Sequence, residues 1–63
     1  MAGGGEIFVE FVVQGNVVKV TAIDPASGTE VSIMGPAGAP RAALSDAAIR
    51  KLRYMVQKKS GGA

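Results

Sequence analysis

A glycine–asparagine pair between two β-rich segments constrains the fold of this chain more than any other feature. Residues 6–13 and 17–24 are rich in Val, Ile, Phe and Thr, and neither contains a glycine or an internal proline. Gly15-Asn16 between them suits a two-residue hairpin turn with positive φ. The two segments are therefore predicted to pair as an antiparallel hairpin.

A second turn signal follows directly, in the sequence DPASGT of residues 24–29. Pro25 favours a type I turn, Asp24 can accept hydrogen bonds from the backbone N–H groups of the turn, and Gly28 can supply a left-handed exit. A third strand is expected over residues 29–34. The three strands together form an antiparallel meander.

The two turns independently place the same side chains on one face of the sheet. The first turn pairs position 13 with 18 and 11 with 20, and the second pairs 22 with 31 and 20 with 33. A slip of one residue would mix these positions with those of the other face. The shared face is apolar throughout and comprises Ile7, Val9, Phe11, Val13, Val18, Val20, Ala22, Val31 and Ile33.

One amphipathic helix is predicted after the sheet, over residues 45–59. Ser45 is the expected N-cap, with Asp46 in the first turn and Leu44 packing on Ile49 as a hydrophobic staple. Residues 35–44 form the connection, since GPAGAP is too rich in Gly and Pro for a helix or strand, and one helical turn after Pro40 is an open alternative within it. The apolar arc of the helix comprises Ala48, Ile49, Leu52, Met55 and Val56.

Packing that arc on the apolar sheet face gives an α+β fold of the order βββα. Residues 6–59 form a single domain, and the Gly-rich segments 1–5 and 60–63 are expected to be disordered tails.

The composition excludes most site chemistry. The 63 residues include no Cys and no His, which rules out disulfides, a thiol nucleophile, an imidazole base and the usual zinc, haem and iron–sulfur sites. We therefore expect no catalytic residue, no metal ligand and no cofactor, and hence no enzyme. No segment approaches the roughly 20 apolar residues of a membrane span, and no signal peptide is visible, so a cytoplasmic protein without a membrane partner is expected.

The net charge of +2 hides a difference between the two halves of the chain. Residues 1–40 carry a net charge of −3 and residues 41–63 a net charge of +5. A basic helix face of this kind either contacts a nucleic acid or an acidic partner, or is simply solvated. The candidate contact residues are Arg50, Lys51, Arg53, Tyr54 and Lys58, of which Tyr54 could stack on a base.

Self-association is the expected route to stability. A domain of about 60 residues buries only about 60% of the surface of its unfolded chain. The first strand is an edge strand, apolar and without proline, and such edges readily pair with another chain. We expect a homodimer or higher homo-oligomer joined through the first strand or the second sheet face, with contacts from Ile7, Phe8, Glu10, Val12, Ile23 and Met34.

Residues 18–36 (VKVTAIDPASGTEVSIMGP), residues 51–55 (KLRYM) and Glu10-Phe11 carry a family resemblance. Over roughly residues 8–57 the chain resembles a domain-of-unknown-function family of short alphaproteobacterial proteins. The resemblance implies a small bacterial cytoplasmic protein, and it implies no activity, cofactor or site residue.

The leading hypothesis is therefore a non-enzymatic, self-associating interaction module. Two alternatives are a nucleic-acid-associated accessory protein that uses the basic helix face, and a small subunit whose second sheet face docks on a larger protein complex.

Overall fold

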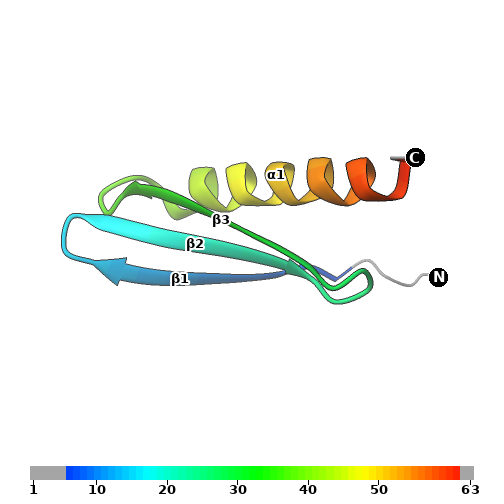
Figure 1. Ribbon diagram of the computed structural model, residues 1–63. Helices are drawn as coiled ribbons and strands as arrows, with labels where there is room; N and C mark the ends of the chain where they lie inside the picture. The colour runs from blue at the N-terminus through cyan, green and yellow to red at the C-terminus, as the bar shows by residue number, and fades with distance from the viewer. Residues whose placement is uncertain (1–5, 62–63) are drawn as a thin grey trace.

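The chain folds as three antiparallel strands followed by one helix (Figure 1). The computed structural model describes the backbone of residues 6–61 and the side chains of residues 6–58. The strands are β1 (Phe8–Gln14), β2 (Val17–Asp24) and β3 (Thr29–Pro36), and the helix is α1 (Arg41–Gly61). The predicted βββα arrangement is confirmed. The expected tail over residues 1–5 and the last two residues of the expected C-terminal tail lie outside the described part of the chain.

The strand register is the one that the two turns predict. Strand β2 lies between β1 and β3, with Phe11 opposite Val20 and Val20 opposite Ile33. Gly15 has a φ of 62°, whereas no described residue other than glycine has a positive φ, Asn16 included. Positive φ at the first central position alone is typical of a type II′ turn. Gly15 is therefore the position of this hairpin turn at which glycine is favoured.

Asp24 organises the second turn as expected. Its carboxylate accepts hydrogen bonds from the Ala26 N–H at 3.1 Å and from the Ser27 hydroxyl at 2.9 Å. Its carbonyl oxygen accepts a hydrogen bond from the N–H of Gly28 at 2.8 Å, and Gly28 has a φ of 73°. Asp24 thus accepts the hydrogen bonds that hold the turn, through its side chain and its carbonyl oxygen, and this turn brings β3 back beside β2.

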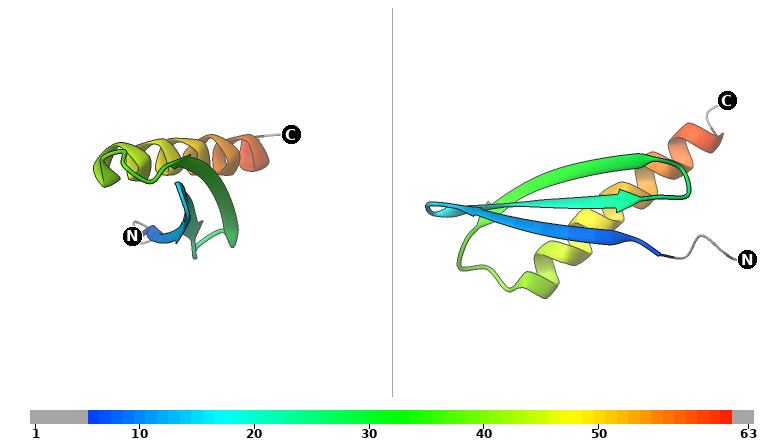
Figure 2. Two further views of the ribbon diagram at one scale, coloured as in Figure 1. Left: turned by 90° about the vertical axis from the view of Figure 1, so that its left-hand side faces the viewer. Right: turned by 90° about the horizontal axis from the view of Figure 1, so that it is seen from below.

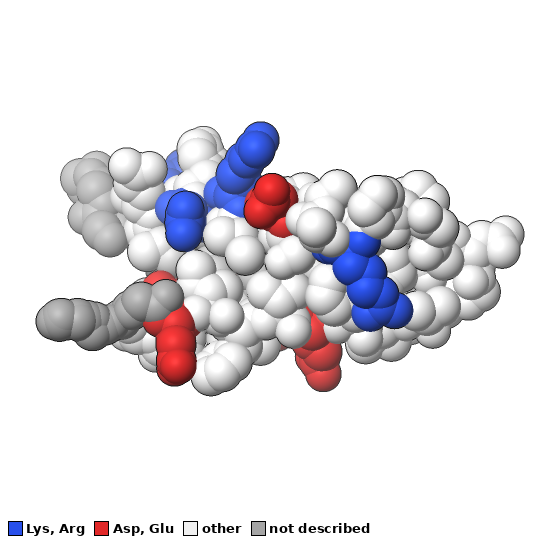
Figure 3. Space-filling model, turned by 180° about the vertical axis from the view of Figure 1, so that it is seen from behind, with Lys and Arg blue, Asp and Glu red and all other residues white. Residues whose placement is uncertain are grey.

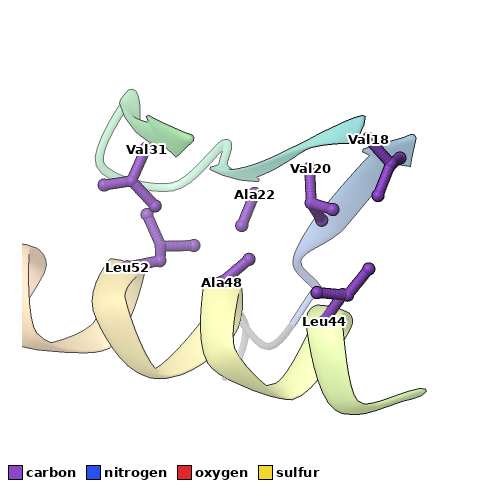
Figure 4. Close-up of a cluster of buried hydrophobic side chains, with 7 residues drawn as sticks. All are labelled: Val18, Val20, Ala22, Val31, Leu44, Ala48 and Leu52. Atoms are coloured by element: carbon purple, nitrogen blue, oxygen red, sulfur yellow. The ribbon is translucent and has the colours of Figure 1, made fainter. Parts of the chain in front are cut away.

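The core lies between the sheet and the helix. Figure 4 shows side chains of β2 and β3 pointing at side chains of α1, with Ala22 facing Ala48 near the middle of the layer. Val20, Ala22, Ala48 and Leu52 are fully buried. The complete buried cluster is Val18, Val20, Ala22, Val31, Leu44, Ala48 and Leu52.

The predicted helix start is wrong, because α1 begins at Arg41 and not after an N-cap at Ser45. The carbonyl oxygen of Pro40 accepts hydrogen bonds from the N–H groups of Ala43 and Leu44, so Ser45 lies within the helix. Leu44 is a buried core residue, one helical turn before Ala48. Burying a leucine contributes about 1.5–3 kcal/mol, whereas a serine cap contributes about 1 kcal/mol, so packing determines where the helix starts.

Apart from the helix start, the strand and helix ends differ from the prediction by up to two residues, which is ordinary for such boundaries. Strand β1 begins at Phe8, and Ile7 precedes it and packs partly against the core. Strand β3 continues to Pro36, and α1 continues to Gly61, two residues beyond its predicted end.

Val13 is not a core residue, although the register places it on the core face. Its side chain is 55% exposed. The helix crosses the strands at an angle, and the end of the sheet next to the β1–β2 turn has no helix over it (Figure 2). The apolar face is therefore only partly covered, and the uncovered part lies at the end of β1.

Gly35 is required by the close approach of the helix to β3. A Cβ at this position would lie 2.6 Å from Cδ2 of the buried Leu44. We predict that Gly35→Ala lowers the free energy of unfolding by about 1–3 kcal/mol, because Leu44 must leave its packed position. Chemical denaturation measures the change. Gly38→Ala is the matched control, since a Cβ there meets nothing within 4 Å; an equal loss in both variants would contradict the packing explanation.

Candidate self-association surface

The face of the sheet opposite α1, here called the open face, is formed by alternate residues of the three strands. The register arranges them in rows across the sheet, such as Glu10–Thr21–Ser32 and Val12–Lys19–Met34. The complete set is Phe8, Glu10, Val12, Gln14, Val17, Lys19, Thr21, Ile23, Glu30, Ser32, Met34 and Pro36.

Large apolar side chains lie exposed toward both ends of the open face. Phe8 is 56% exposed at one end, and Met34 is 58% exposed toward the other, where Val12 and Val17 are exposed as well. Between them Thr21 is buried, and its hydroxyl and that of Ser32 are 3.0 Å apart and share a hydrogen bond. The open face is thus an ordered, mixed surface with apolar ends and a polar middle.

The predicted contact residues do not all share this surface. Phe8, Glu10, Val12, Ile23 and Met34 belong to the open face, with Ile23 half-buried between Phe8 and Glu30. Ile7 precedes β1 and packs against the core, so its place in the predicted set is not supported by its position.

The hairpin turn fixes which backbone groups of β1 point away from the sheet. In a two-residue hairpin the closing pair, here Gln14 and Val17, is hydrogen-bonded, and hydrogen-bonded pairs then alternate along the strands. Val9, Phe11 and Val13 therefore lie in pairs whose N–H and C=O groups point outward. Within residues 6–58, no side chain bonds to these outward groups of β1.

The opposite edge of the sheet is partly blocked. The same alternation turns the backbone groups of Glu30, Ser32, Met34 and Pro36 outward from β3. The ammonium group of Lys51, on α1, donates a hydrogen bond to the Ser32 carbonyl oxygen at 3.2 Å. Pro36 has no N–H to offer at this edge. The strand β3 is thus a poor template for a further strand, whereas β1 is a good one.

Strand β1 is also the least covered strand on the core face. None of its residues is fully buried, and α1 packs mainly against β2 and β3. The guanidinium of Arg41, at the start of α1, lies over the Phe11 ring, 4.8 Å from its centroid. Beyond it toward the turn, Val12 and Val13 are exposed on the two faces.

The basic residues predicted for anion contact all lie exposed on α1. Two of them already have partners in the fold, since Lys51 bonds to Ser32 and the ammonium of Lys58 lies 5.8 Å from the Tyr54 ring centroid. Basic side chains gather mainly on the helix half of the molecule and acidic ones mainly on the sheet half (Figure 3). The charge asymmetry of the sequence is therefore also an asymmetry in space.

Sequence reasoning missed three features of this surface: the Lys51–Ser32 bond, the Arg41–Phe11 contact and the exposure of Val13. The first two depend on how α1 lies across the sheet, which the strand register does not determine. The position of Val13 directly before the turn pair was the only signal for its exposure, because strand ends are the first part of a sheet that a crossing helix leaves bare.

Among the described residues, no group of three acidic, His or Cys side chains could hold a metal ion. No described helix has both the length and the apolar character needed to cross a membrane.

Comparison with known proteins gives one match. The family model described as a domain of unknown function, DUF6898, matches residues 4–59. No curated protein and no solved structure shows significant similarity to the chain. The match spans all three strands and almost the whole of α1, and the chain therefore belongs to the DUF6898 family, a domain family of unknown function.

Proposed function

We propose that this protein is a non-enzymatic, self-associating interaction module, and that a second copy of the chain binds at the β1 edge of the sheet. The observation that carries the proposal is the difference between the two sheet edges. Lys51 occupies one outward carbonyl of β3 and Pro36 lacks an N–H, whereas all outward backbone groups of β1 are unpaired within residues 6–58.

A second copy fits this surface better than an unrelated protein. An open strand edge is complementary to another open strand edge, and each copy brings one.

The other two functions that the sequence suggests have less support. Lys51 and Lys58, two of the five candidate nucleic-acid contacts, interact with groups of their own chain. Docking on a larger complex would use the open face, but no feature of that face identifies a particular partner. Bacterial origin and a cytoplasmic location remain part of the proposal and rest on the sequence alone.

Sedimentation equilibrium at micromolar concentration tests the proposal. The expected mass is at least twice the 6.4 kDa of one chain. Val12→Glu should lower the mass toward that of one chain, because it places a charge on the bare part of β1. Tyr54→Glu is the matched control, since Tyr54 is also an exposed large side chain but lies on α1, and the mass of this variant should equal that of the natural chain.

A single species of 6.4 kDa at all concentrations would overturn the proposal. Equal effects of the two substitutions would show that β1 is not part of the contact surface.

A further inference from the structure

We infer, on the basis of the proposed self-association, that two copies pair β1 to β1 in antiparallel orientation, with the two-fold axis passing beside Val12. The product is a continuous six-stranded sheet that carries both helices on the same face. The pattern of outward backbone groups, the charges on β1 and the position of α1 together determine this register.

The outward groups limit which residues can face each other. Hydrogen-bonded pairs between the copies can form only among Val9, Phe11 and Val13, because their N–H and C=O groups point toward the neighbouring copy. In a symmetric antiparallel pair of this kind, one residue of β1 lies opposite the same residue of the second copy. The candidates near the middle of the strand are Glu10, Phe11 and Val12.

Two of these three candidates bring unfavourable contacts. A pair centred on Glu10 sets two carboxylates directly opposite each other, which is destabilising. A pair centred on Phe11 brings both copies of Arg41, and with them the first turns of both helices, to the same place above the axis, since Arg41 lies over the Phe11 ring.

The register centred on Val12 matches the side chains on both faces. Val12 faces Val12 of the second copy, and Glu10 faces Gln14 of the second copy, whose amide can donate to the carboxylate. On the core face Phe11 lies opposite Val13 of the second copy, which covers a side chain that is 55% exposed in one chain. Each Phe11–Val13 pair also exchanges two backbone hydrogen bonds.

This register uses the part of the sheet that the helix leaves free. The end of β1 next to the β1–β2 turn has no helix over it (Figure 2), and the start of α1 lies nearer the middle of the strand, where Arg41 meets Phe11. A pair centred on Val12 therefore sets the two helix starts further apart along the strands than a pair centred on Phe11 does.

Cross-linking through single cysteines tests the register directly, because the natural chain contains no cysteine. In the inferred pair the two Val12 residues face each other in a non-hydrogen-bonded position, with Cα atoms about 4.5 Å apart, which a disulfide can span. Val12→Cys should therefore form a disulfide-linked dimer under mild oxidation, seen by non-reducing electrophoresis and mass spectrometry. Met34→Cys is the control. Met34 lies in the same row of the open face but on the opposite edge strand, β3, and this variant should remain monomeric on the gel.

A second variant tests the pairing without a covalent bond. Val13→Pro removes an N–H that points outward, so the hydrogen bonds between β1 and β2 are kept. Each copy loses the one hydrogen bond that this N–H donates to the other copy. We expect the dimer dissociation constant to rise at least about tenfold, with an unchanged circular dichroism spectrum.

The outcomes separate the two proposals. A dimeric natural chain in which Val12→Cys fails to cross-link, or in which Glu10→Cys or Phe11→Cys cross-links better, would overturn the register but leave self-association standing. A monomeric natural chain would overturn both.

Discussion

Replacing Ala48 by Asp should leave the chain largely unfolded at neutral pH. Ala48 is fully buried and faces the fully buried Ala22 across the layer between helix and sheet. A carboxylate there would have no partner, and an unpaired buried charge costs several kcal/mol. A domain of this size has a stability of only about 3–8 kcal/mol, so the substitution removes most of it.

The pH dependence of this variant gives a second readout. Burial raises the pKa of an Asp in the folded state above its value in the unfolded state, so the folded state holds its proton more tightly. The variant should therefore lose stability as the pH rises through the interval between the two pKa values. Circular dichroism from acidic to neutral pH measures the effect.

Ala47→Asp is the matched control for Ala48→Asp. It makes the same substitution one residue earlier in α1, at an exposed position, and should leave the stability almost unchanged. Equal unfolding of both variants would show that helix propensity, and not burial, is responsible.

Replacing Leu52 by Ala should lower the free energy of unfolding by about 2–5 kcal/mol. Leu52 is one of the two largest side chains that are fully buried, and it reaches from α1 toward Val31 of β3 (Figure 4). Its removal leaves a cavity in a core of only seven buried residues, which has little other apolar surface to compensate.

Urea denaturation at a fixed protein concentration measures the loss, since self-association would make the stability depend on concentration. Arg53→Ala, on the exposed side of the same helical turn, should change it by less than about 0.5 kcal/mol. A loss below about 1 kcal/mol in Leu52→Ala would mean that the helix does not pack on the sheet as described.

The sheet could be predicted from the sequence because two local signals agreed. Gly15 and Gly28 occupy positions of positive φ in turns of defined length, and the alternation of apolar residues admits one register between them. Turn chemistry and strand periodicity are local properties, so they need no knowledge of how the elements pack.

The helix start and the covered part of the sheet could not be predicted in the same way. Ser45 has the local properties of an N-cap, but the burial of Leu44 against β3 depends on contact between distant segments, which Gly35 permits. The candidate surface shows the same division. The side chains on the open face follow from the register, whereas the hydrogen bond from Lys51 to the Ser32 carbonyl of β3 depends on the angle at which α1 crosses the sheet.

The hydrogen bond from Lys51 to the Ser32 carbonyl also bears on the risk of fibril formation. A small sheet with two available edges can add copies at both, and repeated addition leads to open-ended cross-β aggregates. Here Lys51 occupies one outward carbonyl of β3 and Pro36 lacks an N–H, so both residues disfavour strand addition at that edge. In the proposed dimer the β1 edge is paired, so α1, through Lys51, would help to limit further growth of the sheet.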